Sequence, residues 1–588
     1  MAAASPDQPR GVDLSGAQES IRLSAADAEQ PEWVLDNARR TDPAVDQWPS
    51  EVLHDKAKKV LVALVKRACG AEPWEAAEVA KLLAPSFRGA TEIRPRELAL
   101  AFDDGSARVW RPKGVLTQEL SGAGEFEAVI GRLMAPFEGK KSNYFAKIVR
   151  VHLDEGARFR TEALVHLDGK GQGGLFQVNM EWELEWVVTD EASHAVAIDA
   201  IRVTHYDEAA TKVPLYADVA AAAFADCAAY EQEFLHGIED YAGRTDRLIG
   251  APYLGMQGLA VGDVNGDGLD DLYVPQQAGL PNRLFLHRPD GTLEDVTQAS
   301  RTGVLETTRS ALIVDHDNDG DQDLLLALGP ALLVMKNDGK GVFGESQLHK
   351  AGSPGDIYSL SAADADQDGD LDVYACRYAT NGVLFSVPTP YHDATNGNPN
   401  VYYRNDGDTF TIATDEVGLG ENNTRFSLAS VWEDFDLDGD PDLFVANDFG
   451  RDSYYRNEGG RFDEIGAETG ADDIAAGMGV SVGDYDQDGD FDLYITNMFS
   501  SAGQRIVPQQ EFMGGKNEEV HGFYESHARG NTLLANRGDG TFEDRTEAAD
   551  VAVGGWGWGA MFVDFNNDGR EDLFSPDGFL TNDKPDDL

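Results

Sequence analysis

The chain has 588 residues, of which 104 are acidic and 48 are basic, so its formal net charge is −56. A chain of this length is expected to form two or more domains, and a hydrophobic content of 42% is enough for real cores. The negative charge disfavours nucleic acid and anionic membranes as partners and attracts cations. A high-salt habitat would produce the same bias.

The cysteines, the N-terminal residues and the lengths of the apolar stretches limit the possible cellular locations. Cys69, Cys227 and Cys376 are far apart, which argues against a disulfide scaffold and against a zinc site built on cysteine pairs. No basic segment followed by an apolar run marks a signal peptide, and no apolar stretch is long enough to span a membrane. We therefore expect no membrane insertion, and either a cytoplasmic protein or a mature chain whose leader was removed.

The first 207 residues alternate between helical and strand patterns after a polar lead-in at 1–48. Helices are expected at 51–69, 74–83 and 124–137, and strands at 97–102, 107–110, 144–153, 159–167, 176–188 and 196–206. The clearest strand places Phe176, Trp182 and Trp186 on one face and glutamates on the other. Long antiparallel strands after helices predict an α+β domain over 49–207, with a curved sheet wrapped over its helices.

The order of these elements resembles the cone-shaped fold of nuclear transport factor two and its relatives. The resemblance covers roughly residues 50–207 and rests on the pattern of elements, without a motif. It implies a ligand pocket at the mouth of the cone. The simpler interpretation, which we favour, places Phe176, Trp182 and Trp186 in the hydrophobic core. Residues 208–250 are predicted to form a helical connector.

Residues 251–588 are repetitive, and their most regular element is an acidic motif that occurs six times. The motifs start at residues 263, 315, 364, 434, 484 and 564. Most intervals are close to 50 residues, roughly the length of one four-stranded propeller blade, and the two longer ones carry insertions near 380–400 and 501–526. Short apolar runs flank each motif, so the acidic loop is expected to join two inner strands of a blade.

A second repeated element is an Asn-containing turn followed by Phe or Leu. It begins at Asn337, Asn405, Asn457 and Asn536, with a weaker copy at His287. Asn, Asp and Gly suit the positive φ angles of tight hairpins, so these segments are predicted outer hairpins. No such hairpin is seen after the sixth motif, because only 16 residues follow Asp572. The last blade then lacks its outer strands unless another segment supplies them.

The predicted fold class is therefore mainly β, a β-propeller preceded by an α+β cone-like domain. Six blades carry the motif, and the ring has seven blades if one further blade lacks it. The sequence leaves the closure of the ring and the oligomeric state open.

The acidic motifs have the spacing of a metal-binding loop. Oxygen-bearing residues at positions 1, 3, 5, 7 and 9 fold around one ion, position 7 through its backbone carbonyl, and glycine at position 6 permits the turn. Many hard oxygen ligands in a flexible loop select calcium over zinc, copper or magnesium. Position 12, a glutamate in EF-hands, is never glutamate here, which excludes an EF-hand and predicts about six calcium ions in shorter loops.

The predicted ligands are Asp263, Asn265, Asp267, Leu269 and Asp271 in loop one, Asp315, Asp317, Asp319, Asp321 and Asp323 in loop two, Asp364, Asp366, Asp368, Asp370 and Asp372 in loop three, Asp434, Asp436, Asp438, Asp440 and Asp442 in loop four, Asp484, Asp486, Asp488, Asp490 and Asp492 in loop five, and Asp564, Asn566, Asp568, Arg570 and Asp572 in loop six.

Calcium has two expected consequences. Each close pair of carboxylates costs on the order of 1 kcal/mol even in water, so calcium should stabilise the folded propeller by linkage. Calcium loops of extracellular modules bind with a Kd of roughly 10⁻⁴ to 10⁻³ M, which is useful only where calcium is plentiful. We therefore expect an extracellular, periplasmic or cell-surface location.

The motifs resemble the FG-GAP repeat, also called the VCBS-type repeat, of integrin α-chain propellers. Two segments, 391–399 and 527–533, are similar to those of bacterial secreted proteins with ASPIC/UnbV-type architecture. The resemblance covers about residues 254–588. It implies calcium ligation in the six loops, a propeller that usually has seven blades, and an extracellular or cell-surface setting, and it implies no catalytic residue.

Few residues point to catalysis. His392, Asp393, His521 and His527 lie in the two insertions, where a general base or a transition-metal site is conceivable, although polar loop residues are the simpler interpretation. The first hypothesis is a secreted or surface binding or adhesion module for a protein or glycan. The second is an extracellular polysaccharide lyase, hydrolase or metal-dependent oxidase with its site in the insertions or at the domain junction. The third is a structural subunit of a surface assembly.

Overall fold

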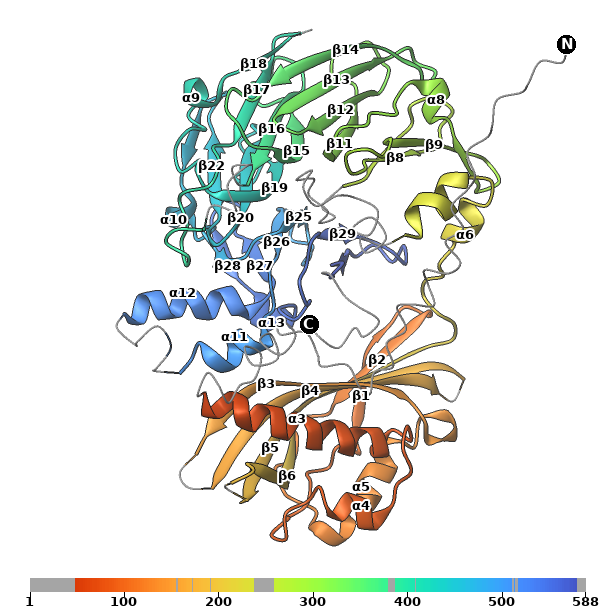
Figure 1. Ribbon diagram of the computed structural model, residues 1–588, viewed down its shortest axis with the longest axis vertical. Coiled ribbons are helices and arrows are strands. Elements are labelled where there is room, and N and C mark those ends of the chain that lie inside the picture. Colours follow the sequence, from red (N-terminus) through yellow and green to blue (C-terminus); the bar gives the residue numbers. More distant parts are fainter. Residues whose placement is uncertain are drawn as a thin grey trace, which may run out of the picture.

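The computed structural model of the chain describes residues 48–154, 157–171, 173–190, 192–236, 258–378, 387–407, 409–509, 512 and 517–578. Residues 1–47 of the predicted lead-in, residues 237–250 of the predicted connector and part of each insertion lie outside these residues. The structure has two parts (Figure 1). The N-terminal part is one large sheet packed on helices, and the C-terminal part is an arc of smaller sheets.

The sheet near the N-terminus has six antiparallel strands in the order β1-β2-β6-β5-β4-β3. They are β1 (Leu98–Asp103), β2 (Ala107–Pro112), β3 (Asn143–Leu153), β4 (Arg158–Gly171), β5 (Gly174–Asp190) and β6 (Ala195–Thr211). The helices are α3 (Pro49–Ala68), α4 (Ala76–Ala80) and α5 (Phe126–Leu133), with 3-10 turns η1 (Ala123–Glu125) and η2 (Glu138–Lys140). Helix α4 is shorter than predicted because Leu83 forms a β-bridge with Ile198.

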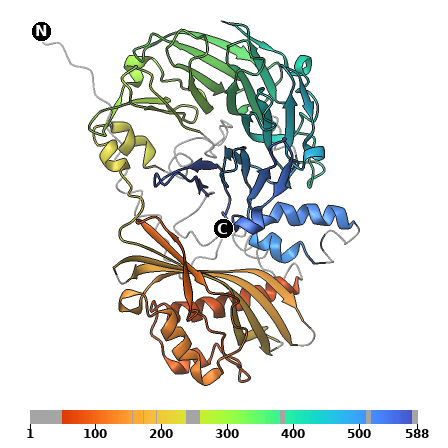
Figure 2. The ribbon, with the colours of Figure 1, turned by 180° about the vertical axis from the view of Figure 1, so that it is seen from behind.

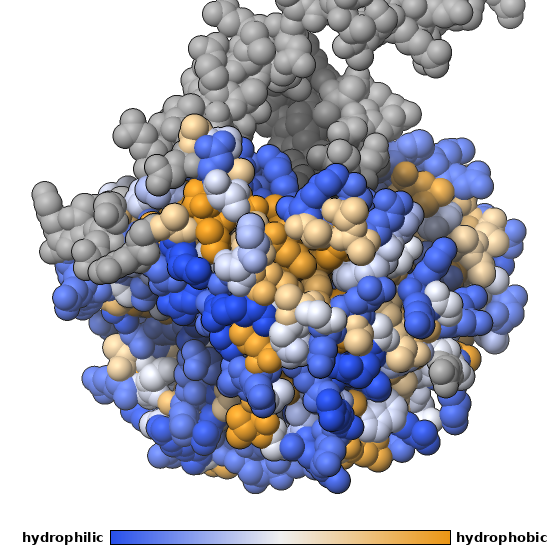
Figure 3. All heavy atoms as spheres, turned by 90° about the horizontal axis from the view of Figure 1, so that it is seen from below, coloured by the Kyte–Doolittle hydropathy of each residue, from blue (hydrophilic) through white to orange (hydrophobic). Residues whose placement is uncertain are grey.

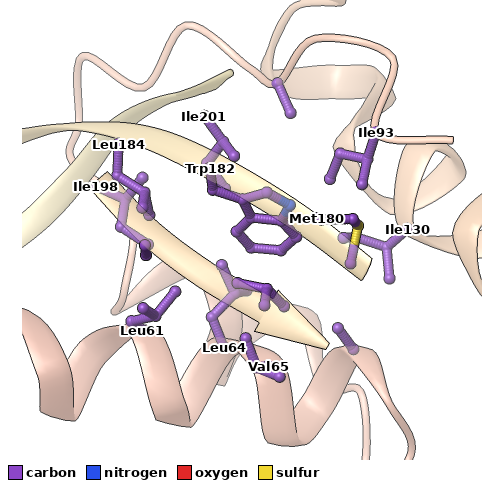
Figure 4. Close-up of a cluster of buried hydrophobic side chains, with 14 of the residues drawn as sticks. Leu61, Leu64, Val65, Ile93, Ile130, Met180, Trp182, Leu184, Ile198 and Ile201 are labelled. Carbon is purple, nitrogen blue, oxygen red and sulfur yellow. The ribbon is translucent and has the colours of Figure 1, made fainter. Parts of the chain in front are cut away.

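The core of this domain lies between the sheet and its helices. Alternate residues of β5 point inward, and Figure 4 shows Trp182 packed above Leu61 and Leu64 of α3. Trp182 is 1% exposed and Trp186 is 0% exposed. The indole N–H of Trp186 donates to the hydroxyl of Thr161 at 2.9 Å. Both tryptophans therefore belong to the core, as the simpler interpretation predicts.

Six small sheets follow along an arc (Figure 2). Five have four strands, and the sixth has two within the described residues. Blades one to three are β7 (Ala260–Gly262), β8 (Asp271–Val274), β9 (Arg283–His287), β10 (Leu293–Asp295); β11 (Thr308–Val314), β12 (Asp323–Leu328), β13 (Ala331–Asn337), β14 (Phe343–Lys350); and β15 (Ile357–Ala363), β16 (Asp372–Arg377), β17 (Val401–Asn405), β18 (Phe410–Ile412). Blades four to six are β19 (Phe426–Glu433), β20 (Asp442–Asp448), β22 (Ser453–Asn457), β23 (Phe462–Glu464); β25 (Gly479–Gly483), β26 (Asp492–Thr496), β27 (Thr532–Asn536), β28 (Phe542–Asp544); and β29 (Met561–Val563), β30 (Asp572–Phe574).

The remaining elements lie before, between and within the blades. They are α6 (Ala220–Ala223), the π-helix η3 (Tyr230–Phe234), α8 (Thr297–Ser300), α9 (Thr414–Val417), α10 (Gly466–Thr469), α13 (Thr546–Ala549), the paired strands β21 (Gly450–Arg451) and β24 (Ile474–Ala475), and the insertion helices α11 (Ser501–Ile506) and α12 (Glu518–Arg529). Every acidic loop joins the first and second strands of its blade, as predicted. The chain is mostly β, and its repeats form a β-propeller.

Apolar layers between neighbouring blades hold the propeller together. Leu325 and Val334 of blade two pack with Leu360 and Val373 of blade three in one buried cluster. On the other side of blade one, the connector takes the place of a neighbouring blade, since Phe224 and Phe234 cover Phe285. Successive apolar residues in the second strand of a central blade, such as the buried Leu324, Leu325 and Leu326 of β12, therefore give that blade two buried faces.

The fifth-blade insertion fastens the propeller to the N-terminal domain. Arg505 of α11 is 7% exposed, and its guanidinium donates to both carboxylate oxygens of Glu51, at 2.9 and 2.8 Å, and to the carbonyl of Ile148 at 3.1 Å. At a second contact, Asn566 Nδ2 donates to Asp104 Oδ2 at 2.9 Å. The two parts of the chain thus meet through paired polar groups.

The surface seen in Figure 3 is mostly polar, as expected for a strongly acidic chain, and the cysteines form no disulfide bond. Hydrophilic residues cover most of the face seen in Figure 3, with hydrophobic residues in smaller patches. All three cysteines are buried and free, which confirms the prediction against a disulfide scaffold. Among the described helices, none has the length and apolarity that crossing a membrane requires.

Candidate metal centres

In four of the acidic loops, the carboxylates at positions 1, 3 and 5 converge. Each residue places one oxygen within 4.8 Å of the others, in the groups Asp315, Asp317 and Asp319; Asp364, Asp366 and Asp368; Asp434, Asp436 and Asp438; and Asp484, Asp486 and Asp488. Loops one and six carry Asn265 and Asn566 at position 3, so an amide oxygen replaces one carboxylate there. The alternate spacing of the sequence thus becomes a cluster of oxygens.

The loop backbone brings these groups together. In loop four, Asp434 Oδ1 accepts the N–H of Asp438 at 3.0 Å, and Asp434 Oδ2 accepts the N–H of Gly439 at 2.9 Å. Asp438 Oδ1 in turn accepts the N–H of Asp440 at 3.0 Å. Short aspartate side chains favour this kind of local turn, and Gly439 at position 6 has a φ of 103°, which favours glycine.

Several loop oxygens are buried and have no hydrogen-bond partner among the described residues. They are the Oδ1 atoms of Asp315, Asp317, Asp364, Asp366, Asp436 and Asp490. An ionised carboxylate can only accept hydrogen bonds, and a buried one is costly unless it is paired or coordinates a metal. Clustered hard oxygens that lack donors are what a calcium ion requires.

The charges of the loops act on one another. Burial first, and then the neighbouring loop carboxylates, raise the pKa of Asp366 and of Asp436. Burial and a hydrogen bond with Asp488 raise the pKa of Asp490 to about 6. A divalent cation would relieve this repulsion and favour the ionised carboxylates.

The aspartate at position 9 has a structural role that its spacing did not predict. Asp442 is 0% exposed; its Oδ1 accepts the backbone N–H of Asn457 and its Oδ2 accepts the hydroxyl of Tyr454, both at 2.8 Å. Asp372 makes the equivalent bonds with Asn405 and Tyr402. Burial raises the pKa of Asp372 to about 6 and that of Asp442 to about 7.

These bonds tie the second strand of a blade to its third strand. In loop six, Asp572 is exposed, and its bond among the described residues lies within the loop, from the N–H of Phe565 at 3.3 Å. That position 9 closes the calcium shell, and that position 7 adds its backbone carbonyl, stay predictions.

The asparagines of the outer hairpins also have a role beyond the turn. Asn457 Nδ2 donates to the carbonyl of Ala365 in loop three at 2.7 Å and to that of Pro441 in loop four at 3.1 Å. Asn337, Asn405 and Asn536 make the corresponding pairs of bonds. Each amide therefore links two neighbouring acidic loops. The signal for this role was the recurrence of Asn at the same point of each hairpin.

The histidines of the two insertions meet, and most of their contacts are packing contacts. His527 Nε2 lies 3.0 Å from the carbonyl oxygen of His392, whose ring stacks on Phe523. His521 lies six residues, nearly two turns of α12, earlier and packs on Phe512. Within the described ranges, these histidines are not in any group of three metal-capable side chains.

Asp393, the fourth catalytic candidate, lies between two arginines. Its carboxylate is 2.5 Å from Arg425 Nη1 and 3.6 Å from Arg451 Nε. Burial opposes ionisation, but the hydrogen bond and the charge of Arg425 keep the pKa of Asp393 below its usual range. A paired, ionised carboxylate of this kind fixes the insertion to blade four. A catalytic role for these four residues stays a prediction.

The domain junction holds a cavity of about 530 Å³. The outer face of the N-terminal sheet contributes Arg150 and Glu181, and the fifth blade contributes Arg529 and Asp550. Burial raises the pKa of Glu181. The hypothesis of an extracellular enzyme with its site at the domain junction would place that site in this cavity, and it stays a prediction.

Comparison with known proteins agrees with the repeats. The model of a family described as FG-GAP-like repeat matches residues 263–326, 315–375, 434–495 and 520–575. The chain therefore contains FG-GAP-like repeats, as the acidic motifs predicted. Membership of a bacterial secreted group and the cone-like N-terminal fold stay predictions.

Curated relatives match a limited part of the chain. Cartilage acidic protein 1 of Xenopus tropicalis is 30% identical over 202 residues, which are 33% of this chain and 29% of that protein. The human protein of the same name is 29% identical over 206 residues, 33% of this chain and 28% of that protein. The match thus spans less than a third of the length of these relatives.

One solved structure describes specific recognition of non-reducing terminal N-acetylglucosamine by an Agrocybe aegerita lectin. It aligns with a TM-score of 0.33 and 16% identity, over 55% of this chain and 75% of that chain. A TM-score this low does not establish a shared fold.

Proposed function

We propose that this protein is an extracellular binding or adhesion module whose β-propeller is stabilised by calcium. The observation that supports it best is the convergence of three carboxylates in each of four loops, with buried oxygens that have no donor. FG-GAP-like repeats and the similarity to an acidic protein named for cartilage point in the same direction. Weak calcium loops suit a compartment where calcium is plentiful.

Calcium would act on the scaffold. Each loop joins the first and second strands of one blade, so neutralising its carboxylates removes repulsion at that end of the blade. Any ion that binds the folded state and not the unfolded state stabilises the fold by mass action. Because the loops would hold calcium for stability, we place the ligand-binding surface on another part of the propeller.

The insertion face is the best-supported ligand surface. The insertions join second and third strands, at the blade ends opposite the acidic loops, and their aromatic side chains cluster there. Tyr391 is 48% exposed and packs against Phe449 and Tyr524, while Arg451 lies over the ring of Phe523. Aromatic residues and arginine are enriched in recognition surfaces. The proposed ligand is a protein or a glycan.

The first experiment tests calcium. The purified chain is melted in calcium at about 2 mM and in a chelator, and its metal content is analysed. We expect bound calcium and a higher melting temperature in calcium. An unchanged melting temperature with no bound calcium would refute the calcium part of the proposal.

The second experiment tests binding. The chain is applied to arrays of extracellular-matrix proteins and of glycans, in calcium and in chelator. Tyr391→Ala should abolish ligand binding. The control variant Tyr216→Ala should retain it, because Tyr216 lies outside the insertions and is 64% exposed. Loss with both variants, or with neither, would count against a ligand site on the insertion face.

A further inference from the structure

Side chains at position 4 connect each of three acidic loops to the loop of the next blade. Their amide nitrogens donate to the position 6 carbonyl of that loop. The donors and acceptors are Asn318 with Gly369 at 2.7 Å, Gln367 with Gly439 at 2.7 Å, and Gln487 with Gly569 at 2.5 Å. The amides of Asn318 and Gln367 also donate to Asp370 and Asp440, the position 7 side chains. The bonds therefore end where the next loop is predicted to offer its backbone ligand.

The residue at position 4 lies between two predicted metal ligands of its own loop, at positions 3 and 5. Gln367 lies between Asp366 and Asp368, two members of the carboxylate group of loop three. Its φ of 60° is in the left-handed region. An ion held by positions 3 and 5 would fix the peptide units on both sides of Gln367, and with them the direction of its side chain.

Loop four provides a natural exception. Its position 4 is Leu437, which has the same φ of 60° and is 56% exposed. Leucine has no amide to donate, so this link is missing between loops four and five. The conformation of the loop therefore does not depend on the amide.

The outer-hairpin asparagines add a second link at some junctions. Loops three and four are joined by Asn457 as well as by Gln367. Loops four and five are joined by Asn536, which donates to the carbonyls of Phe435 and Phe491. The junction between loops three and four is thus doubly linked, and the next junction is singly linked.

We propose that the position 4 amides couple calcium binding in neighbouring loops, so that loops two, three and four fill cooperatively. An ion in loop three orients Gln367, and the amide then holds positions 6 and 7 of loop four near the geometry that an ion needs. The second ion has less conformational freedom to remove. By linkage, an ion in loop four favours one in loop three to the same extent. This inference rests on the proposed calcium function.

The test is a calorimetric calcium titration of the metal-stripped full chain. The wild-type protein should bind with a Hill coefficient above 1, and Gln367→Leu should lower that coefficient and weaken binding by about fivefold, the lower end of ordinary coupling. Leu437→Gln should raise the coefficient, since it supplies the missing amide. Gln177→Leu, in the N-terminal sheet, is the matched control and should titrate as the wild type does.

The outcomes separate two failures. Independent binding in the wild-type protein, or an unchanged isotherm for Gln367→Leu, overturns the coupling but leaves the calcium function intact. No calcium uptake by the wild-type protein overturns the calcium function itself. Because leucine is already accommodated at position 4 of loop four, Gln367→Leu should melt near the wild-type temperature in chelator, where calcium affinity makes no contribution, and that melt verifies its folding.

Discussion

Asp452 occupies a place where other blades use asparagine, and replacing it should stabilise the protein. In blade three, Asn400 Oδ1 accepts the N–H of Arg377 at 2.8 Å, and its Nδ2 donates to the hydroxyl of Tyr374 at 3.0 Å. Asn282 and Asn531 hold the same position in blades one and five. In blade four, Asp452 Oδ1 accepts the N–H of Asn447 at 2.7 Å.

The second oxygen of Asp452 has no partner. The side chain is 2% exposed, and Oδ2, which stands where the other blades have the amide nitrogen, makes no hydrogen bond within the described part of the chain. Phe444 stands two residues after the position 9 aspartate, where blade three has Tyr374, so the hydroxyl is missing as well. A buried polar group left unsatisfied costs about 1–3 kcal/mol.

The pH dependence has a definite sign. Burial first, and then repulsion from Asp473, raise the pKa of Asp452 well above its ordinary value. The folded state then binds more protons than the unfolded state, so the stability contribution falls as pH rises above about 4, the carboxyl's unfolded pKa. Asp452→Asn removes this loss. An uncharged amide costs less to bury than an ionised carboxylate, so we expect Asp452→Asn to raise the free energy of unfolding by about 1 kcal/mol or more at pH 7, and by much less at pH 4.

Chemical denaturation in calcium at pH 4 to 8 measures this difference. Asp463→Asn, which removes an exposed carboxylate from β23, is the control and should change stability little at any pH. A loss of stability with Asp452→Asn at pH 7 would refute the reasoning, because it would mean that the ionised carboxylate has a favourable partner.

Three further changes test other parts of the structure. Arg505→Met leaves the carboxylate of Glu51, 13% exposed, without its partner and should destabilise the domain junction by about 3 kcal/mol, seen as separate melting of the two parts. Arg150→Met, at an exposed arginine 3.4 Å from Gln504, should have little effect. Asn457→Ala removes the amide between loops three and four and should lower the free energy of unfolding by about 1–3 kcal/mol, measured by denaturant titration; no loss would show that the two carbonyls are satisfied without it. Trp186→Phe leaves the buried hydroxyl of Thr161 without its donor, and a melt should show a loss of about 1 kcal/mol or more; a gain would contradict the assigned bond.

The repeats made the propeller predictable. A loop of alternating acids with a central glycine, flanked by short apolar runs, occurs often enough for its spacing to fix the blade length and the strands that it joins. Strand ends were less predictable: β6 runs from Ala195 to Thr211, beyond the predicted residue 206, because pairing with β5 continues past the apolar pattern.

The site was predictable only where its geometry is local. Positions 1, 3 and 5 lie within five residues, so the turn that gathers them follows from the residue types, and the convergence of Asp434, Asp436 and Asp438 could be expected. The bonds of Asn457 join residues 92 positions apart, and those of Arg505 join residues 454 positions apart. No periodicity within one segment carries that information.

Position 9 shows why the acidic residues of one motif need separate treatment. Its conservation of type across the six copies first indicates a ligand, yet the carboxylate of Asp442 is held by the third strand of its own blade. Removing that carboxylate would therefore damage the blade whether or not an ion is present. Removing the carboxylate of Asp436, whose Oδ1 has no donor, would instead remove repulsion from the empty loop and weaken the ion's site. A position 3 variant should thus lose stability only in calcium, and a position 9 variant should lose it in chelator as well.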